Sequence, residues 1–337
     1  MSPSPMAPTL HDRIVVESFL GDGEHRTLAD DVLDGLTRPF KELPPKHFYD
    51  EHGAQLFDQI CDLPEYYPTR CEREILETRA AEIVARTGAA ELVELGSGTA
   101  AKTRLLLAAM HEAGTLDRYV PIDVTESMVR ESAARLVAEF DELRVHGIVG
   151  DFERHLGNVP ESIPGRPRIV AFLGGTIGNF TPGSRRRFLR SLSALLGPDD
   201  FLLIGTDLVK DPAILEAAYD DSAGVTAAFN RNVLTVLNRE LDADFAVDAY
   251  DHVAFFDRDR EWIEMRLRAQ RPQRVTVGKL GLRLTFAAGE ELRTEISAKF
   301  TPERIGGDLA AAGMELVESL TDEAGLFALH LARVRTP

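Results

Sequence analysis

The sequence predicts an α/β fold in which a Rossmann-like sheet of parallel strands ends in an antiparallel hairpin and is accompanied by a second, α+β domain. Three observations support this prediction. Apolar strand segments alternate with amphipathic helical segments over residues 71–209, a glycine-rich turn follows the first of these strands, and period-two segments without intervening helices fill residues 245–299. Regular alternation of strands and helices favours parallel pairing with helices on both faces, whereas consecutive period-two segments favour antiparallel pairing.

Length and composition limit the class of protein. A chain of 337 residues is long enough for two ordinary domains. Its formal net charge of -17 disfavours a nucleic-acid partner, because binding to a phosphate backbone requires a basic surface. Cys61 and Cys71 are too few for a disulfide framework, and no apolar run is long enough for a signal peptide or a membrane span. We therefore expect a cytoplasmic protein that needs no nucleic acid, membrane, metal ion or obligatory protein partner.

The chain is expected to divide into an arm and two domains. Residues 1–17 are rich in proline and small residues and predict a disordered arm. Residues 18–70 contain helical segments and an aromatic turn, and together with residues 210–299 they are expected to form a substrate-binding domain. Residues 71–209 and 300–337 are expected to form the domain built on the parallel sheet, whose last helix and hairpin follow the insertion.

The hydrophobic period predicts the individual elements. In the parallel-sheet domain, the expected strands are 91–95, 118–124, 144–151, 168–175, 201–208, 314–320 and 326–334, and the expected helices are 71–89, 102–110, 127–140, 184–196 and 301–313. In the second domain, helices are expected at 28–36, within 43–60 after its proline pair, and at 211–221 and 225–241. The strands expected there are 245–256, 261–269, 273–280, 281–289 and 292–300, which we expect to form one antiparallel sheet.

The glycine-rich turn lies in residues 91–102, which read ELVELGSGTAAK. Gly96 and Gly98 permit positive φ and let the backbone approach a ligand before a helix begins near Lys102. The spacing also fits dinucleotide-binding proteins, so a nicotinamide oxidoreductase and an ordinary turn without a ligand remain alternatives. Glu94 favours another cofactor, because its carboxylate would repel a pyrophosphate but suits the ammonium and sulfonium groups of S-adenosylmethionine.

Ligands of parallel sheets bind at the carboxyl ends of the strands, so the side chains there are candidates for a cofactor site. Asp123 could accept hydrogen bonds from two ribose hydroxyls or cap the next helix. Asp151 could accept the exocyclic amine of adenine with Phe152 along the base, although a turn and a core ring explain the pair equally. Lys102 could hold a carboxylate or could simply be solvated.

Two other segments carry polar groups in patterns that suit a substrate site. The segment GGTIGNF allows close approach of backbone at Gly174 and offers a donor and an acceptor at Asn179, or forms an ordinary loop turn. The period of the segment LRTEISAKF places Glu295, Ser297 and Lys299 on one face of a strand. Solvent is the alternative explanation for such a polar face.

Aromatic and apolar side chains admit a second interpretation besides core packing. Tyr49, Phe57 and Tyr66 lie close together in the sequence, where they either fill a core or form an aromatic wall for a cationic substrate. Met265 has the period of a core residue, and Tyr219 lies on a helical segment in which either role is open.

Several segments together resemble the histidine-specific methyltransferases of ergothioneine biosynthesis. They are LPPKHFYDEHGAQLFDQI, LPEYYPTR, ELVELGSGTAAKTR, FLGGTIGNF, GTDLVKD, AYDDSAGVTAAFNRNVL and FAAGEELRTEISAKF. The resemblance extends from about Leu28 to the carboxyl end. It implies a Rossmann-like class I methyltransferase sheet, S-adenosylmethionine as methyl donor, and L-histidine as the substrate, which would receive three methyl groups on its α-amino nitrogen and become hercynine.

The resemblance also implies roles for individual residues. S-adenosylmethionine would be bound by Gly96, Lys102, Asp123, Asp151 and Phe152. The amine and carboxylate of histidine would lie near Tyr49, Phe57, Gly174, Thr176, Asn179 and Tyr219, and its imidazole near Tyr66, Met265, Glu295 and Ser297. Tyr49 and Asn179 would be the catalytic residues. His47 stands where the family often has Trp and Gly175 where it often has Ser, differences that concern local packing.

Methyl transfer requires an unprotonated amine aligned with the sulfonium methyl, so we expect positioning to contribute most of the catalysis. A desolvated cleft favours the neutral amine, and aromatic faces could hold the methylated cation. Two alternatives remain at this point: a methyltransferase for another amino acid or small amine, and a non-catalytic regulatory protein that binds S-adenosylmethionine.

Overall fold

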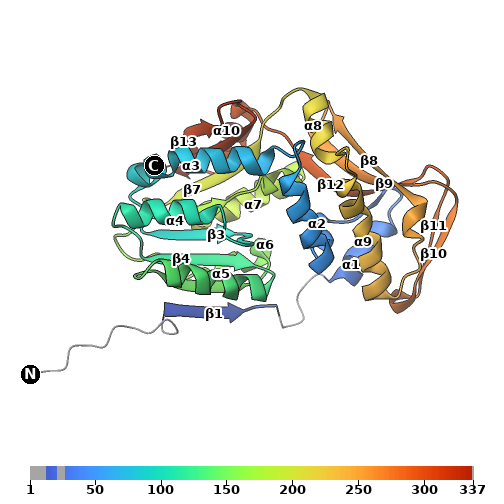
Figure 1. Ribbon diagram of the computed structural model, residues 1–337, viewed down its shortest axis with the longest axis horizontal. Coiled ribbons are helices and arrows are strands. Elements are labelled where there is room, and N and C mark those ends of the chain that lie inside the picture. Colours follow the sequence, from blue (N-terminus) through green and yellow to red (C-terminus); the bar gives the residue numbers. More distant parts are fainter. Residues whose placement is uncertain (1–12, 21–26, 336–337) are drawn as a thin grey trace, which may run out of the picture.

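An eight-stranded, mostly parallel sheet forms the larger part of the molecule (Figure 1). The computed structural model describes residues 13–20 and 27–335. The strands of this sheet are β1 (Ile14–Ser18), β3 (Glu91–Leu95), β4 (Arg118–Asp123), β5 (Arg144–Val149), β6 (Arg168–Phe172), β7 (Phe201–Asp207), β13 (Met314–Thr321) and β14 (Phe327–Val334). Their order is β1-β5-β4-β3-β6-β7-β14-β13, and β14 is antiparallel to both of its neighbours. This order confirms the predicted Rossmann-like class I methyltransferase sheet with its antiparallel hairpin.

Helices cover both faces of the large sheet. They are α3 (Pro68–Thr87), α4 (Thr103–Glu112), α5 (Glu126–Glu139), α6 (Phe152–His155), α7 (Pro182–Leu195) and α10 (Pro302–Ala311). Leu92 belongs to the core shared with α3, α4 and α5, whereas Val93 and Leu95 belong to the core shared with α7 and α10. Successive side chains of a strand point to opposite faces, so this division explains why β3 is apolar on both sides. Within the described residues, no helix combines the length and apolarity needed to cross a membrane.

The amino-terminal part of the chain differs from the predicted disordered arm. Ile14–Ser18 forms β1, the edge strand of the large sheet, and pairs in parallel with β5. Val16 lies opposite Gly147, where an added Cβ would come within 3.3 Å of the Val16 side chain. The prediction was wrong for this strand because the proline-rich start obscured the three β-branched residues that follow it, Ile14, Val15 and Val16. The rest of the expected arm, residues 1–12, lies outside the described residues.

A smaller unit contains the predicted insertion and the segment that precedes α3. Its helices are α1 (Leu28–Leu36), α2 (Glu51–Asp62), α8 (Pro212–Tyr219) and α9 (Val225–Leu241), and its strands are β2 (Lys41–Glu42), β8 (Tyr250–Asp257), β9 (Trp262–Ala269), β10 (Gln273–Val277), β11 (Leu282–Phe286) and β12 (Glu291–Ala298). The sheet order is β2-β12-β9-β8, with β2 parallel to β12, while β10 and β11 pair separately. The prediction of a single antiparallel sheet was therefore wrong in two respects. The strands β10 and β11 form a sheet of their own, and β2, whose two residues carry no detectable period, adds a parallel strand.

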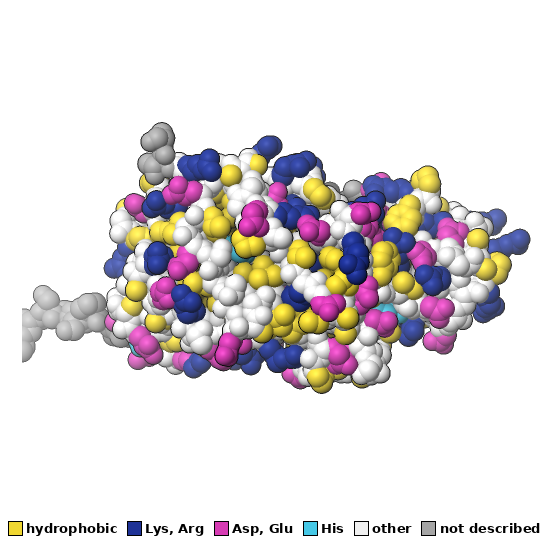
Figure 2. Space-filling model, turned by 90° about the horizontal axis from the view of Figure 1, so that it is seen from above, with side chains coloured by type: hydrophobic (Ala, Val, Ile, Leu, Met, Phe, Trp, Pro, Cys, Tyr) yellow, Lys and Arg dark blue, Asp and Glu magenta, His cyan; other side chains and the backbone are white. Residues whose placement is uncertain are grey.

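The smaller unit meets the large sheet near the carboxyl ends of β6 and β7 (Figure 1). Short 3₁₀ helices complete the fold: η2 (Pro45–Phe48), η3 (Leu156–Asn158), η4 (Thr176–Asn179), η5 (Val247–Ala249) and η6 (Gly278–Leu280). At the junction η4 packs on β12, and the Phe300 amide donates to the Asp207 carbonyl at 2.8 Å. Figure 2 shows acidic and basic side chains interspersed over the face seen there. The junction therefore brings the end of β12 to the edge of the sheet where ligands of this fold bind.

One buried titratable group in the sheet predicts a pH-dependent stability. His330 of β14 is buried, and its ring nitrogens contact Thr206 Oγ1 and Ser319 Oγ at 2.8 Å each. Burial lowers the pKa of His330 to about 4. Because an unfolded histidine titrates near 6.5, the unfolded chain takes up this proton first as the pH falls, and the free energy of unfolding decreases between about pH 6.5 and pH 4.

The free energy of unfolding of the wild type should decrease between about pH 8 and pH 5. In His330→Gln we expect this decrease to be smaller by about 2 kcal/mol. Urea unfolding of both proteins at the two pH values measures the difference, which does not depend on any constant effect of the substitution. An equal loss in both proteins would mean that other groups carry the acid sensitivity.

Candidate active site

The glycine turn lies at the carboxyl end of β3 and is shaped by Asp123 at the end of β4. Gly96 and Gly98 have φ values of 73° and 49°, and Gly98 is held by its amide, which donates to Asp123 Oδ2 at 2.9 Å. The other oxygen of Asp123 accepts from the Thr125 amide at 2.9 Å. Each carboxylate oxygen has room for a further hydrogen bond, so Asp123 can position the loop and still accept from a ligand.

Asp151 and Phe152 lie beside this turn, as the sequence predicted. Asp151 caps α6 by accepting from the Glu153 amide at 2.9 Å. The Phe152 ring packs against Phe172 at 5.3 Å between centroids, and its edge lies 3.7 Å from the position of a Cβ added to Gly96. The exposed backbone of Gly96 therefore lies beside an aromatic ring, and the carboxylate of Asp123 binds the same turn at Gly98, an arrangement that suits a purine base and a ribose.

Lys102 follows the turn and is not simply solvated. Its ammonium forms an ion pair with Glu72 of α3, a side chain with no exposed surface. Glu72 also accepts from the Gly174 amide, at 2.8 and 3.0 Å to its two oxygens. A Cβ added to Gly174 would lie 3.8 Å from Lys102 Nζ and 3.5 Å from Thr176 Oγ1. The pair thus connects the turn after β3 with the turn after β6, which places the predicted cofactor and substrate residues side by side.

Glu94 does not have the position that the sequence suggested. It is buried beneath the turn, and its carboxylate accepts from the hydroxyls of Thr103 and Tyr119. Burial raises the pKa of Glu94 to about 7, against the opposing effect of these two hydrogen bonds. Because both oxygens have protein partners, we assign Glu94 to the support of the loop and not to the recognition of a charged ligand.

The aromatic residues form a continuous row from four segments of the chain. Ring centroids are separated by 5.5 Å between Tyr49 and Phe57, by 6.2 Å between Phe57 and Tyr66, and by 6.5 Å between Tyr66 and Tyr219. All three pairs meet edge to face. Tyr49 is 50% exposed, whereas Tyr219 is buried, so the row leads from the surface into the junction.

The polar face of β12 points into the same junction. Ser297 is 5% exposed and Lys299 is completely buried, which excludes the solvated face that the sequence left open. Met265 of β9 lies directly opposite Glu295 in the strand register, so their side chains share a face. Among the described residues, none forms a hydrogen bond with the Glu295 carboxylate. Desolvation raises its pKa to about 7 although Lys299 opposes the shift, which marks Glu295 as a group that a ligand could satisfy.

The remaining substrate candidates come from η4. Asn179 is partly exposed, and within residues 27–335 its side-chain amide has no hydrogen-bond partner. Thr176 donates to the Leu173 carbonyl at 3.1 Å and so supports the turn. Gly178 lies against β12, since a Cβ at this position would come within 3.4 Å of Ser297 Oγ. The structure therefore brings every predicted substrate residue to one junction between the two units.

A buried network beneath Tyr219 and Ser297 was not assigned a role from the sequence. Lys299 Nζ donates to Asp207 Oδ2 at 2.8 Å, to the Tyr219 hydroxyl at 3.0 Å and to Ser297 Oγ at 2.9 Å. Asp207 ends β7 and also accepts from Tyr67 and Lys210. The period of β12 indicated that Lys299 shares a face with Ser297, but its partner Asp207 lies 92 positions away (299 − 207) and no local pattern connects them.

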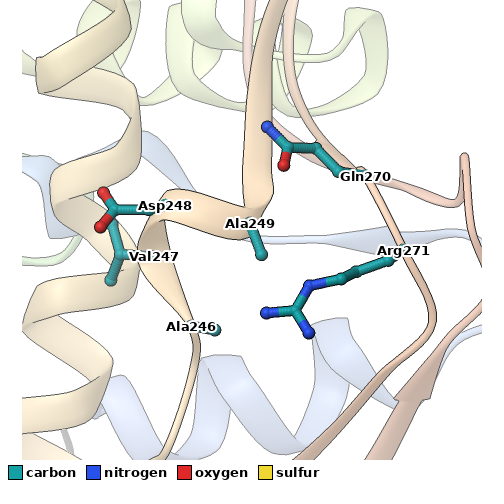
Figure 3. Close-up of a pocket in the computed structure, with 6 residues that line it drawn as sticks. All are labelled: Ala246, Val247, Asp248, Ala249, Gln270 and Arg271. Carbon is teal, nitrogen blue, oxygen red and sulfur yellow. The ribbon is translucent and has the colours of Figure 1, made fainter.

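A hollow in the smaller unit lies between η5 and the turn after β9 (Figure 3). Its lining residues are Ala246, Val247, Asp248, Ala249, Gln270 and Arg271. The Gln270 amide already donates to Asp251 at 2.7 Å, and no residue predicted for a site lines this hollow. Across the described parts of the chain, no group of three or more His, Cys, Asp or Glu side chains is arranged to hold a metal ion. The junction is therefore the candidate active site.

Comparison with known proteins points to one family. The family described as "Histidine-specific methyltransferase, SAM-dependent" matches residues 28–334. A histidine N-alpha-methyltransferase of Mycobacterium tuberculosis is 53% identical over 321 residues, which cover 95% of this chain and 99% of that protein. The corresponding protein of Mycolicibacterium smegmatis is 55% identical over 311 residues, covering 92% and 96%. Ergothioneine biosynthesis protein 1 of Neurospora crassa is 31% identical over 305 residues, covering 87% of this chain and 34% of that longer protein.

Proposed function

Because this chain belongs to the family of histidine-specific, S-adenosylmethionine-dependent methyltransferases, we propose that it transfers three methyl groups to the α-amino nitrogen of L-histidine, giving hercynine for ergothioneine biosynthesis. The observation that carries this function is the Glu295 carboxylate, which has no hydrogen-bond partner in the described part of the chain and lies near a row of aromatic rings. A nitrogen heterocycle with an N–H donor matches that carboxylate. A phosphate-bearing cofactor would not, and this disfavours the nicotinamide alternative.

We propose that S-adenosylmethionine is held by Gly96, Lys102, Asp123, Asp151 and Phe152. The arrangement supports this assignment, since the Phe152 ring lies against the open backbone of Gly96 and the Asp123 carboxylate accepts from the amide of Gly98 in the same turn. Lys102 has N–H groups beyond the one bound to Glu72, so it can donate a hydrogen bond to a second carboxylate. When bound, the cofactor supplies a methyl group on a sulfonium, which an amine attacks directly.

We assign the histidine side of the site to residues of both units. Glu295, Ser297, Met265 and Tyr66 would surround the imidazole, while Asn179, Tyr219, Gly174, Thr176, Tyr49 and Phe57 would surround the carboxylate and amine. We propose the same division of the chain as the sequence predicted, except that Ser18 belongs to β1 of the large sheet. Residues 71–209 and 300–337 would bind the methyl donor, and the rest of residues 18–70 together with residues 210–299 would bind the substrate.

We also propose that the protein acts in the cytoplasm, where Cys61 and Cys71 would remain reduced.

The chain's contribution to catalysis would be mainly to position the amine and to keep it neutral. Desolvation at the junction, with added repulsion from Glu295, raises the pKa of Tyr49, so its phenol stays protonated at neutral pH. Half of the Tyr49 side chain is open to solvent, so its hydroxyl and ring are accessible to a ligand. Tyr49 then orients the amine through its hydroxyl and ring and does not act as a phenolate base, while the aromatic faces of Tyr49 and Phe57 accommodate the methylated cation.

Incubation with S-adenosylmethionine and a panel of amino acids, read by mass spectrometry, tests the function. We expect histidine to gain three methyl groups and other amino acids to gain none. Methylation of a different amino acid or amine, or donor binding without any mass gain, would contradict the proposed function. Calorimetric titration with S-adenosylhomocysteine and with NAD distinguishes the two cofactors.

The cofactor assignment predicts the effect of one substitution. Asp123→Ala removes a charged acceptor from two ribose hydroxyls and also releases the Gly98 amide. Hydrogen bonds to charged groups contribute about 1.5–3 kcal/mol each, so we expect S-adenosylhomocysteine to bind at least about tenfold more weakly. Histidine affinity, measured separately by calorimetry, should change less. An unchanged affinity for the homocysteine compound would limit Asp123 to shaping the turn.

A further inference from the structure

The buried ammonium of Lys299 has no role in the site as described so far. We propose that Lys299, fixed by Asp207, sets the direction of the hydrogen bonds of Ser297 and Tyr219, so that the site accepts the neutral imidazole of histidine and rejects the imidazolium. This inference rests on the proposed function, because it takes the ring to lie against Glu295 and Ser297. Lys299 is thus a positioning residue that acts through two hydroxyls.

The argument begins with the donors of the ammonium. A lysine ammonium has three N–H donors and no acceptor. In the structure these donors have three partners: Asp207 Oδ2 at 2.8 Å, Ser297 Oγ at 2.9 Å and the Tyr219 hydroxyl at 3.0 Å. Both hydroxyl oxygens must therefore accept a hydrogen bond from Lys299. Asp207 fixes the third N–H, so the ammonium cannot rotate away from either hydroxyl.

The two hydroxyls also bind each other, at 2.8 Å between their oxygens. Each hydroxyl has one proton, and one of these two protons is used in the bond between them. A single hydroxyl proton remains for a ligand. When Tyr219 donates to Ser297, the Ser297 oxygen has already accepted two hydrogen bonds, so Ser297 can offer a ligand only its proton.

This polarity selects a protonation state of the substrate. A ring nitrogen that faces the Ser297 proton must be an acceptor, and a neutral imidazole has one such nitrogen. Its other nitrogen carries a proton and matches the Glu295 carboxylate. An imidazolium carries protons on both nitrogens, so one of them would meet the Ser297 donor and the positive charge of Lys299.

The surrounding charges maintain this arrangement. Burial disfavours the charge on Lys299, but Asp207 outweighs that effect and the pKa of Lys299 is raised. Burial likewise opposes the charge of Asp207, and Lys299 and Lys210 outweigh it, so the pKa of Asp207 is lowered. The other titratable groups around the hydroxyl pair and Glu295 are Tyr49, Cys61, Tyr66, Tyr67, Asp207, Lys210 and Lys299. Because Lys210 also pairs with Asp207, removal of Lys299 leaves no unpaired aspartate.

The experiment compares histidine with 3-(1,2,4-triazol-3-yl)alanine, whose ring has nitrogens at the equivalent positions but stays neutral over the range used. The dissociation constants of both ligands are measured by calorimetry from about pH 7.5 to about pH 5.5 with S-adenosylhomocysteine bound. At each pH the dissociation constant of histidine is divided by that of the triazole analogue. In this ratio the titration of the enzyme's own groups, including Glu295, cancels. The variants are Lys299→Met and Tyr219→Phe, since either frees a lone pair on Ser297.

For the wild type we expect the ratio to rise about tenfold over this range, because a free imidazole titrates near 6.5 and only its neutral form would bind. In both variants the rise should shrink to less than about threefold. A flat ratio in the wild type, or a full tenfold rise in a folded variant, would overturn the inference. Tyr219→Phe gives this test even if Lys299→Met does not fold. Failure of histidine to bind the wild type at any pH would instead refute the proposed function, and the inference with it.

Discussion

Gly178→Ala is expected to lower kcat/KM for histidine methylation by about 100-fold, since displacement of reacting groups by about 1 Å costs this much. Gly178 lies where η4 meets β12, and an added Cβ would come within 2.8 Å of the Ala298 carbonyl oxygen and 3.1 Å of the Ala298 nitrogen. Both atoms belong to the backbone of a strand, so the methyl group can be accommodated only if η4 and β12 separate. That movement would displace Asn179 from Ser297 and Glu295, which belong to the two sides of the substrate site.

The matched control is Gly183→Ala on α7, a few residues further along the chain. A Cβ there would meet only Arg187 Nη1, at 3.8 Å, which is an ordinary contact. We expect this variant to retain wild-type kinetics. Circular dichroism and thermal unfolding should show that Gly178→Ala still folds, since overpacking costs about 1–3 kcal/mol. Wild-type kcat/KM in the Gly178 variant would show that the junction is free to open without loss of function.

Local patterns in the sequence were sufficient to predict the large sheet and its turns. The apolar run of β3, the positive φ of Gly96 and Gly98, and the polar groups at the strand ends all follow from hydrophobic period and glycine placement, and the structure has them. The edge strands β1 and β2 could not be recognised in the same way. Each is short or follows a proline-rich segment, and each owes its position to a neighbour that lies far along the chain.

Side-chain partners were harder to predict than strands, because they depend on tertiary contacts. The position of Glu94 before the glycines suggested a ligand contact, but Thr103 and Tyr119 occupy its oxygens. Glu72 had no signal in the sequence, where it lies beside Arg70, Arg73 and Glu74, although it links Lys102 to Gly174. Roles of single residues in the substrate site therefore came from the family resemblance, and they remain predictions that substitutions can test.

The second large effect is expected at Glu295, which would read the imidazole. Its carboxylate has no hydrogen-bond partner among the described residues and lies opposite Met265, on the strand face that includes Ser297. Removing the carboxylate would leave the N–H of the ring unpaired in a desolvated surrounding. Hydrogen bonds to charged groups contribute about 1.5–3 kcal/mol, so Glu295→Ala should weaken histidine binding by about 10- to 150-fold while the affinity for S-adenosylhomocysteine stays near that of the wild type.

Glu291→Ala is the matched control, because Glu291 lies on the same strand but pairs with Arg266 and Arg268, away from the junction. We expect its histidine affinity to be unchanged. Glu295→Met combined with Ser297→Ala should go further, because an apolar strand face favours flat apolar rings, and preference should shift towards tryptophan or phenylalanine. Calorimetry and competition assays on the amino-acid panel measure both effects. Unaltered KM and selectivity in Glu295→Ala would mean that the ring is recognised elsewhere, since a carboxylate that bound the imidazole could not be removed without leaving a buried N–H unsatisfied.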